Sequence, residues 1–247
     1  MSAKGTNFGF RTVLPGEKSR LVRQLFGRVA QRYDIMNDLM SVGIHRLWKA
    51  DMIAWLRPRP NHNIVDVAGG TGDIAQRLLR CVPDGRIVVC DVSAEMLSRG
   101  RDRLFDHGFG DRISWTCGDA ETLPFADSTF DAYTIAFGIR NVTRVDRALR
   151  EARRVLRPGG RFLCLEFGRV AASGLARLYD VYSFNVLPWL GNLVAGDRAA
   201  YVYLVESIRR FPEQREFAAM IEKAGFGLVS VRNLSGGIAA LHSAWRI

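Results

Sequence analysis

The sequence of 247 residues is poor in cysteine and histidine, with four of each. The cysteines, Cys81, Cys90, Cys117 and Cys164, form no C-x-x-C pair and have no histidine at metal-ligand spacing. This pattern argues against a zinc site and against a redox dithiol. We therefore expect that no metal is bound and that the thiols are reduced, as is usual in a cytoplasmic protein.

Long apolar runs are also missing. No 18 consecutive residues are apolar, and residues 1–13 contain no hydrophobic core of a secretory signal. The longest uncharged stretch, Val181–Gly196, is interrupted by Pro188 and Gly191. We expect neither secretion nor a membrane span. With 48% hydrophobic and 24% charged residues, the composition is typical of a globular protein, and the length predicts one domain over residues 1–247.

Acidic residues are the minority among the charges, with 25 against 35 basic residues and a net charge of +10. Such a balance favours an anionic partner, either nucleic acid or an acidic lipid surface. The basic residues are scattered, without the continuous run that marks a nucleic-acid-binding tail. We expect no nucleic-acid partner.

Strand and helix patterns alternate through most of the chain. Strands are predicted at Asn63–Val67, Arg86–Cys90, Arg112–Cys117, Phe130–Phe137 and Arg161–Phe167, and helices at Asp73–Leu79, Ala94–His107 and from Val145 to Leu156, where a turn at Arg157–Gly160 follows. Alternation of this kind indicates a doubly wound, Rossmann-like α/β sheet of mostly parallel strands with right-handed crossovers.

Other segments flank this sheet. Helical patterns at 17–33 and 45–56 predict an N-terminal helical cover over residues 17–56, and residues 168–198 form a connection long enough to predict a helical lid. A helix at 212–224 precedes two strand patterns, 227–233 and 238–245, which predict a C-terminal hairpin and an antiparallel strand.

A glycine loop lies between the first strand and the first helix of the sheet. Gly70-x-Gly72-x-x-Ala75, followed by Asp91 at the end of the next strand, has the form of a dinucleotide fingerprint. However, Asp66 and Asp73 flank the loop, and two carboxylates would repel a pyrophosphate. They would attract the ammonium group of S-adenosylmethionine, which carries no phosphate. We therefore predict this cofactor.

Acidic residues at the following strand ends complete the predicted cofactor site. Asp91 can accept hydrogen bonds from both ribose hydroxyls, with Val92 beside it. Asp119, after the third strand, can accept from the adenine amino group, while the Ala120 N–H donates to the ring. All of these acids rise at the carboxyl edge of the sheet, where ligands bind in such folds.

Further motifs cover nearly the whole chain, and with them it resembles the ubiquinone/menaquinone biosynthesis C-methyltransferases. The motifs are Phe8–Phe10, Tyr33–Ser41, Gly43–Lys49, Ala68–Asp73, Phe137–Val142, Tyr182–Asn185, Tyr203–Ile208 and Asn233–Gly237. The resemblance implies a class I methyltransferase fold and C-methylation of a polyprenylated benzoquinol or naphthoquinol ring. It also implies cofactor contacts at Thr71, Asp91, Asp119 and Ala120. Ala136 stands where similar proteins often have Ser.

Methylation of a ring carbon needs the reduced quinol, whose phenolate directs electron density to the attacking carbon. Arg140 follows the fourth strand and stays protonated, so we expect it to stabilise the phenolate or hold a water that acts as base. Its neighbour Asn141 and Tyr33, in the N-terminal cover with Asn37, are the other expected catalytic residues. His45 has a pKa suited to proton transfer.

Several partners and alternatives follow. Val181–Gly196 would receive the polyprenyl tail, and the basic surface would contact anionic lipid on the inner face of the membrane. A quinone-pathway complex and a homodimer are further expected partners.

The competing functions are an NAD-dependent oxidoreductase, a methyltransferase acting on RNA or another aromatic acceptor, and a noncatalytic scaffold. The intact glycine loop argues against the scaffold.

Overall fold

The structure is a computed structural model, and the residues that it describes are 5–29, 38, 41, 43–106, 108–109, 112–170 and 198–247. Its centre is a seven-stranded sheet in the order β5-β4-β3-β6-β7-β9-β8. The strands are β3 (Asn63–Val67), β4 (Arg86–Asp91), β5 (Ile113–Cys117), β6 (Phe130–Ala136), β7 (Leu156–Phe167), β8 (Gly227–Leu234) and β9 (Ala239–Trp245). Strands β3 to β7 pair in parallel, and β9 is antiparallel to β7 and β8. The predicted fold class is confirmed.

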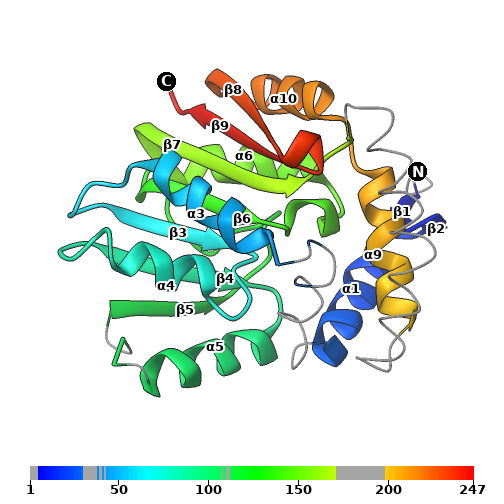
Figure 1. Ribbon diagram of the computed structural model, residues 1–247, viewed down its shortest axis with the longest axis horizontal. Coiled ribbons are helices and arrows are strands. Elements are labelled where there is room, and N and C mark those ends of the chain that lie inside the picture. Colours follow the sequence, from blue (N-terminus) through cyan, green and yellow to red (C-terminus); the bar gives the residue numbers. More distant parts are fainter. Residues whose placement is uncertain are drawn as a thin grey trace.

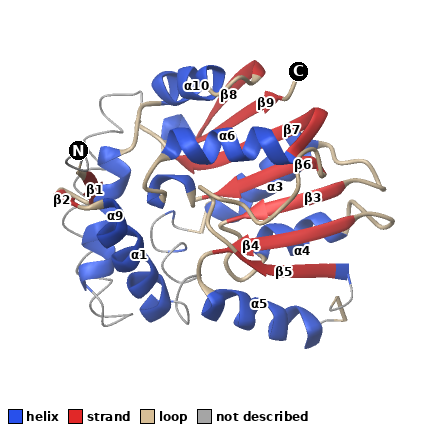
Figure 2. Cartoon of the chain, turned by 180° about the vertical axis from the view of Figure 1, so that it is seen from behind, coloured by secondary structure: helices blue, strands red, loops and turns tan. Residues whose placement is uncertain are grey.

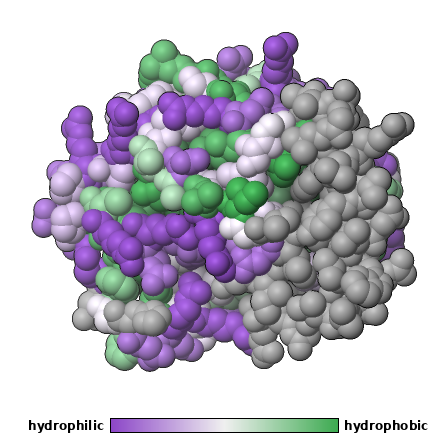
Figure 3. Space-filling view, viewed as in Figure 1, coloured by the Kyte–Doolittle hydropathy of each residue, from purple (hydrophilic) through white to green (hydrophobic). Residues whose placement is uncertain are grey.

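Helices cover both faces of the sheet. Helices α3 (His45–Leu56) and α4 (Asp73–Leu79) lie on one face, and α6 (Val145–Val155) and α10 (Gln214–Lys223) lie on the other, while α5 (Ala94–Asp106) borders β4 and β5 (Figures 1 and 2). The surface over α4 is mainly hydrophilic in Figure 3, because the apolar side of this helix packs on the sheet. Apolar residues of the two faces form two separate core clusters.

The predicted boundaries agree closely with the structure where hydrophobic periodicity is strong. The strand Asn63–Val67, the helix Asp73–Leu79 and the helix His45–Leu56 have the predicted bounds. The expected turn at residues 157–160 is wrong, because β7 begins at Leu156 and includes these residues. These residues form a bulge that is not paired with β6. They form hydrogen bonds with Arg246 near the C-terminus instead: Gly159 N donates to Arg246 O, and Arg246 N donates to Gly160 O.

A second group of elements stands beside the carboxyl edge of the sheet. Helix α1 (Pro15–Val29) and helix α9 (Arg198–Arg210) lie next to the two-stranded hairpin of β1 (Thr6–Phe8) and β2 (Arg11–Val13) (Figure 1). Neither the hairpin nor α9 is predicted by the sequence. The predicted end of the first helix at 33 and most of the predicted lid, 171–197, lie outside the described residues.

Candidate functional site

A cavity of about 1150 Å³, measured with its open mouth, lies at the carboxyl edge of the parallel strands. Loops after β3, β4, β5 and β6 form its floor, and α1 and α3 contribute side chains from the N-terminal cover. Eight of the nine predicted cofactor residues line it, namely Asp66, Gly70, Thr71, Asp73, Asp91, Val92, Asp119 and Ala120. Gly72, the ninth, begins the turn into α4 with φ 78°.

The loop after β3 is built from backbone in the left-handed region. Ala68 and Gly70 have φ of 51° and 56°, and Phe137, after β6, has φ of 56°. Non-glycine residues pay for this conformation in strain, which tends to persist at functional sites. The two loops touch: a Cβ on Gly138 would clash with the Ala68 side chain. Only glycine at 138 therefore lets the ends of β3 and β6 form one continuous floor.

Asp66 lies in the centre of this floor and is 1% exposed. Its Oδ1 accepts a hydrogen bond of 2.8 Å from Thr134 Oγ1 on β6, while its buried Oδ2 has no partner among the described residues. Burial raises the pKa of Asp66 to about 7; the Thr134 bond opposes the rise and Asp73 adds to it. An unsatisfied buried carboxylate oxygen is costly, so the site is prepared for a cationic hydrogen-bond donor.

Asp91 and Asp119 are held by backbone donors. Asp91 accepts from Gly70 N through Oδ2 at 2.9 Å and from Ser93 N through Oδ1 at 2.8 Å. Asp119 Oδ1 accepts from Glu121 N at 2.9 Å. These bonds fix the two carboxylates without exhausting their lone pairs, so each can still accept from a ligand hydroxyl or amino group. Burial raises the pKa of Asp91, and its backbone donors limit the rise.

Asp73 differs from the sequence-based expectation of an uncompensated carboxylate. Lys49 Nζ lies 2.7 Å from its Oδ2, and Arg77 Nε lies 3.0 Å from its Oδ1. Although burial opposes it, these two cations lower the pKa of Asp73. The argument that Asp66 and Asp73 together would repel a pyrophosphate is thereby weakened, since Asp73 is already neutralised.

Asn141 also lines the cavity, at the end of the single turn η3 (Ile139–Asn141) that follows β6. Tyr203 Oη, on α9, donates to its Oδ1 at 3.0 Å, and the Tyr203 ring stacks on Phe8 with centroids 4.2 Å apart. Burial raises the pKa of Tyr203 to about 12, so its hydroxyl stays protonated at neutral pH. One lone pair of the Asn141 amide oxygen is thus taken by Tyr203, and the amide also carries two N–H donors.

Arg140 lies behind the cavity wall and does not appear among the described lining residues. It forms a buried ion pair with Glu166, with Nη1 2.7 Å from Oε1 and both side chains at most 2% exposed. Nη1 also donates to Phe137 O at 2.6 Å. This placement differs from the expected contact with a phenolate: the charge of Arg140 is compensated by Glu166, and its hydrogen bonds brace the loop that carries Asn141.

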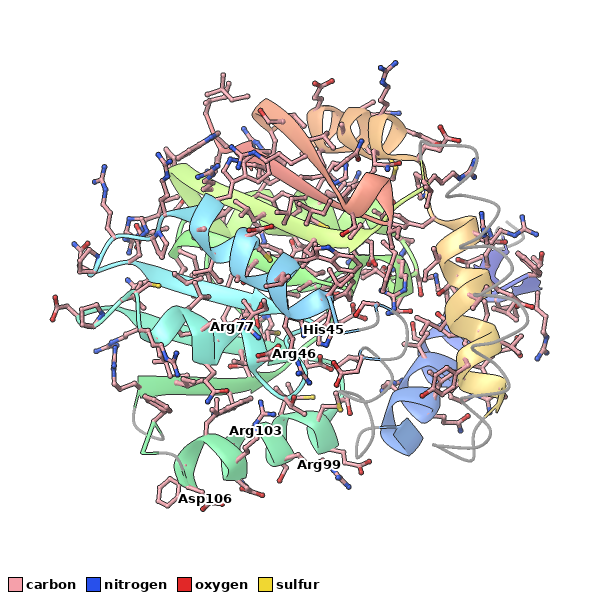
Figure 4. All side chains as sticks on the ribbon, viewed as in Figure 1. His45, Arg46, Arg77, Arg99, Arg103 and Asp106 are labelled. Atoms are coloured by element: carbon pink, nitrogen blue, oxygen red, sulfur yellow. The ribbon has the colours of Figure 1, made fainter. Side chains whose placement is uncertain are left out.

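His45 begins α3, near Arg46 and close to Arg77 on α4 (Figure 4). Its Nε2 lies 2.9 Å from Asp38 Oδ1, and its side chain is 4% exposed. Burial lowers the pKa of His45, although the Asp38 bond opposes this, so the ring is neutral at pH 7. It is not among the described residues that line the cavity. The predicted Tyr33 and Asn37 lie outside the described residues.

Sequence reasoning missed Lys18, Lys49 and Glu121. Lys18 on α1 is buried and donates to Val142 O at 2.9 Å; burial lowers its pKa to about 8, against the opposing effect of Glu121. Glu121 Oε1 accepts from the backbone N–H groups of Thr143 and Arg144 at 3.1 and 2.9 Å. The Lys18 bond docks the cover on the loop after β6, and the Glu121 bonds join that loop to the one after β5. A lysine inside an amphipathic helix pattern is normally a solvated residue, so nothing in the local sequence indicates that Lys18 and Lys49 are buried.

Comparison with known proteins identifies the group to which these features belong. The sequence profile of the ubiE/COQ5 methyltransferase family matches residues 14–246. The chain belongs to this family. The ubiquinone/menaquinone biosynthesis C-methyltransferase UbiE of Paracoccus denitrificans is 59% identical over 244 residues, covering 99% of this chain and 98% of the relative. The protein of that name in Brucella abortus is 55% identical, over 98% of this chain and 91% of its own.

Solved structures agree on the fold. A methyltransferase of Thermotoga maritima that depends on S-adenosylmethionine aligns with a TM-score of 0.66 at 21% identity, over 91% of this chain and 99% of that one. Phosphoethanolamine N-methyltransferase 2 of Haemonchus contortus, solved with S-adenosylmethionine, aligns with a TM-score of 0.60 at 14% identity, over 81% and 52%. At these identities they support the fold alone. The family fixes the chemistry: this protein is a methyltransferase, and S-adenosylmethionine is its cofactor.

The described residues fit this cofactor. The orphaned Asp66 Oδ2 suits its ammonium group, and the fixed carboxylates of Asp91 and Asp119 suit its ribose and adenine donors. Within the part of the chain that the structure describes, no cluster of three or more His, Cys, Asp or Glu could hold a metal ion. No described helix is both long and apolar enough to cross a bilayer.

The raised pKa of Asp66 predicts a pH dependence of cofactor binding. A cation pairs with the ionised carboxylate, which is lost as the pH falls through about 7. The affinity for S-adenosylhomocysteine, measured by calorimetry, should therefore weaken towards pH 5.5, approaching tenfold per pH unit below the pKa. Asp66→Asn should bind more weakly at pH 7.5 and should flatten the profile.

Asp131→Asn is the matched control, because Asp131 accepts from Asn63 N and lies outside the described cavity lining. Its profile should follow that of the wild type. A wild-type affinity that is constant from pH 5.5 to 7.5 would show that Asp66 does not pair with the ligand.

Proposed function

We propose that the protein transfers the methyl group of S-adenosylmethionine to a ring carbon of a polyprenylated benzoquinol or naphthoquinol. The relatives at 55% and 59% identity over nearly the whole chain carry the name of this activity in ubiquinone and menaquinone biosynthesis. The single structural observation that supports the acceptor is Asn141, an amide donor that lines the same cavity as the cofactor acids and is held by Tyr203. The family excludes the oxidoreductase alternative and does not favour an RNA acceptor.

Bound cofactor supplies an electrophilic methyl group on a sulfonium. The protein must then hold a quinol ring beside that group and favour its phenolate. An Asn141 N–H that donates to the quinol oxygen would stabilise the developing negative charge. Tyr203 fixes the amide in this orientation, since its hydroxyl occupies the amide oxygen.

Arg140 acts in this proposal as a positioning residue. Its bond to Phe137 O and its pair with Glu166 hold the 137–141 loop, including the left-handed Phe137, from below. A buried pair of this kind fixes geometry more reliably than it adds stability, and removal of one partner leaves a costly buried charge. Arg140 therefore supports the placement of Asn141 rather than touching the acceptor itself.

Methyl transfer to reduced demethylated quinols of both ring types tests the function directly. The protein is incubated with S-adenosylmethionine carrying a labelled methyl group, and the position of the label is determined by NMR and mass spectrometry. We expect the label on a ring carbon when the reduced quinol is the acceptor. No label is expected when the oxidised quinone is offered instead. Label on oxygen, or on added RNA in place of the quinol, would overturn the proposal.

We also propose that the reaction takes place on the inner, cytoplasmic face of the membrane, because a polyprenyl tail partitions into lipid. The net charge of +10 favours an anionic lipid surface. In the same assay, a long-tail quinol in vesicles of anionic phospholipid should be methylated faster than one in zwitterionic vesicles. A short-tail, water-soluble quinol should show no such preference. Equal rates on both vesicle types would contradict this placement.

The Tyr203–Asn141 bond predicts a specific kinetic pattern. Tyr203→Phe should lower kcat on the order of tenfold, because one hydrogen bond no longer orients the amide. Asn141→Asp keeps the oxygen that Tyr203 uses but removes the N–H donors, and it should lower kcat further, on the order of a hundredfold. Neither variant should change the affinity for S-adenosylhomocysteine by more than about twofold.

Tyr133→Phe serves as the control, since Tyr133 is buried in the core on β6 and does not line the cavity. It should leave kcat near the wild-type value. A Tyr203→Phe protein with unchanged kcat, or one that loses cofactor affinity to the same extent as activity, would argue against this role.

A further inference from the structure

Lys49 is the only basic side chain among the described residues that line the cavity; five carboxylates, those of Asp66, Asp73, Asp91, Asp119 and Glu121, line it as well. It projects from α3, in the N-terminal cover, and its side chain is 5% exposed. A lysine is rarely buried to this extent without a reason, because desolvation of an ammonium group is costly. The ion pair with Asp73 offsets part of this cost but leaves two of the three N–H donors for other partners.

The charges around Lys49 are unbalanced. Asp73 carries one negative charge and is contacted by two cations, Lys49 and Arg77. The trio therefore retains one unit of positive charge, and only Lys49 presents it to the cavity, because Arg77 is not among the described lining residues. Asp66, with its unpartnered Oδ2, is close enough to Lys49 for that cation to lower its pKa. The described cavity lining thus holds both a buried ammonium group and a carboxylate with an unpartnered oxygen.

The methionyl end of the cofactor has the complementary pair of charges on one carbon, an α-ammonium and an α-carboxylate. We propose that Lys49 binds the α-carboxylate, while Asp66 receives the α-ammonium. Asp73 then acts as a positioning residue that holds the Lys49 ammonium at the cavity wall before the ligand arrives. Both charges of the amino-acid end are neutralised, and so is the surplus positive charge of the trio.

The proposed contact would link the N-terminal cover to the sheet. Lys49 belongs to the cover that precedes the sheet, whereas Asp66 and Asp73 belong to the first strand and first helix of the sheet. The carboxylate would therefore join the cover to the sheet, and a ligand without it would lose this link. The inference rests on the cofactor and not on the identity of the acceptor.

The test compares two ligands that differ only in this group: S-adenosylmethionine and its decarboxylated analogue. Wild-type protein should bind the decarboxylated analogue more weakly, on the order of tenfold to a hundredfold, by calorimetry. Lys49→Met should lose affinity for S-adenosylmethionine by a similar factor and should bind the analogue about as well as the wild type does. Lys49→Arg should retain most of the discrimination, because the charge is kept.

Arg46→Met is the matched control, since it removes another basic side chain of α3, one that pairs with Asp38 and lies outside the described cavity lining. It should change neither affinity by more than about threefold. If Lys49→Met weakens both ligands equally, or if wild-type protein does not distinguish them, the carboxylate assignment is overturned. Should Lys49→Met fail to fold in a thermal melt, Lys49→Gln is measured against the same criterion. Failure of the wild type to bind either ligand would instead contradict the methyltransferase assignment.

Discussion

The parallel register of β3, β4, β5 and β6 brings four strand ends to one edge of the sheet, and the position of every described cofactor residue on the sheet depends on it. Asp66 pairs in register with Thr134, and Asp91 with Cys117. Because of this register, the Thr134 hydroxyl can reach across to the Asp66 carboxylate, and Gly70 N can reach Asp91. A slip of one residue would turn each of these side chains to the other face.

Electrostatics then divides the cavity into two ends. At the cofactor end, backbone N–H groups hold Asp91 and Asp119, and one oxygen of Asp66 has no partner among the described residues. Lys49, paired with Asp73, supplies the one cation of the described lining. In the loop after β6, the charges of Arg140 and Glu166 cancel behind the cavity wall, so the polar side chain that the turn η3 presents to the cavity is the neutral amide of Asn141. A neutral donor can stabilise a phenolate without attracting the carboxylate end of the cofactor.

The sequence was informative where the signal is local. The succession of strand and helix patterns predicted β3 and α4 to the residue, and the predicted Asp66, Asp91 and Asp119 all line the cavity. Contacts between distant residues were not predictable: Tyr203 reaches Asn141 across 62 positions, and Lys49 reaches Asp73 across 24. The role expected for Arg140 illustrates the limit, since no local pattern reveals that Glu166 lies beneath it.

Asp66 is the residue through which this account can be tested most directly. A ¹³C NMR titration of its carboxyl group, assigned with Asp66→Asn, measures its pKa in the free protein and with S-adenosylhomocysteine bound. We expect a pKa of about 7 in the free protein, because burial disfavours the charge. We also expect a fall of at least one unit on binding, because the ligand ammonium favours the carboxylate. A free value near 4, or a value that the ligand leaves unchanged, would contradict these expectations.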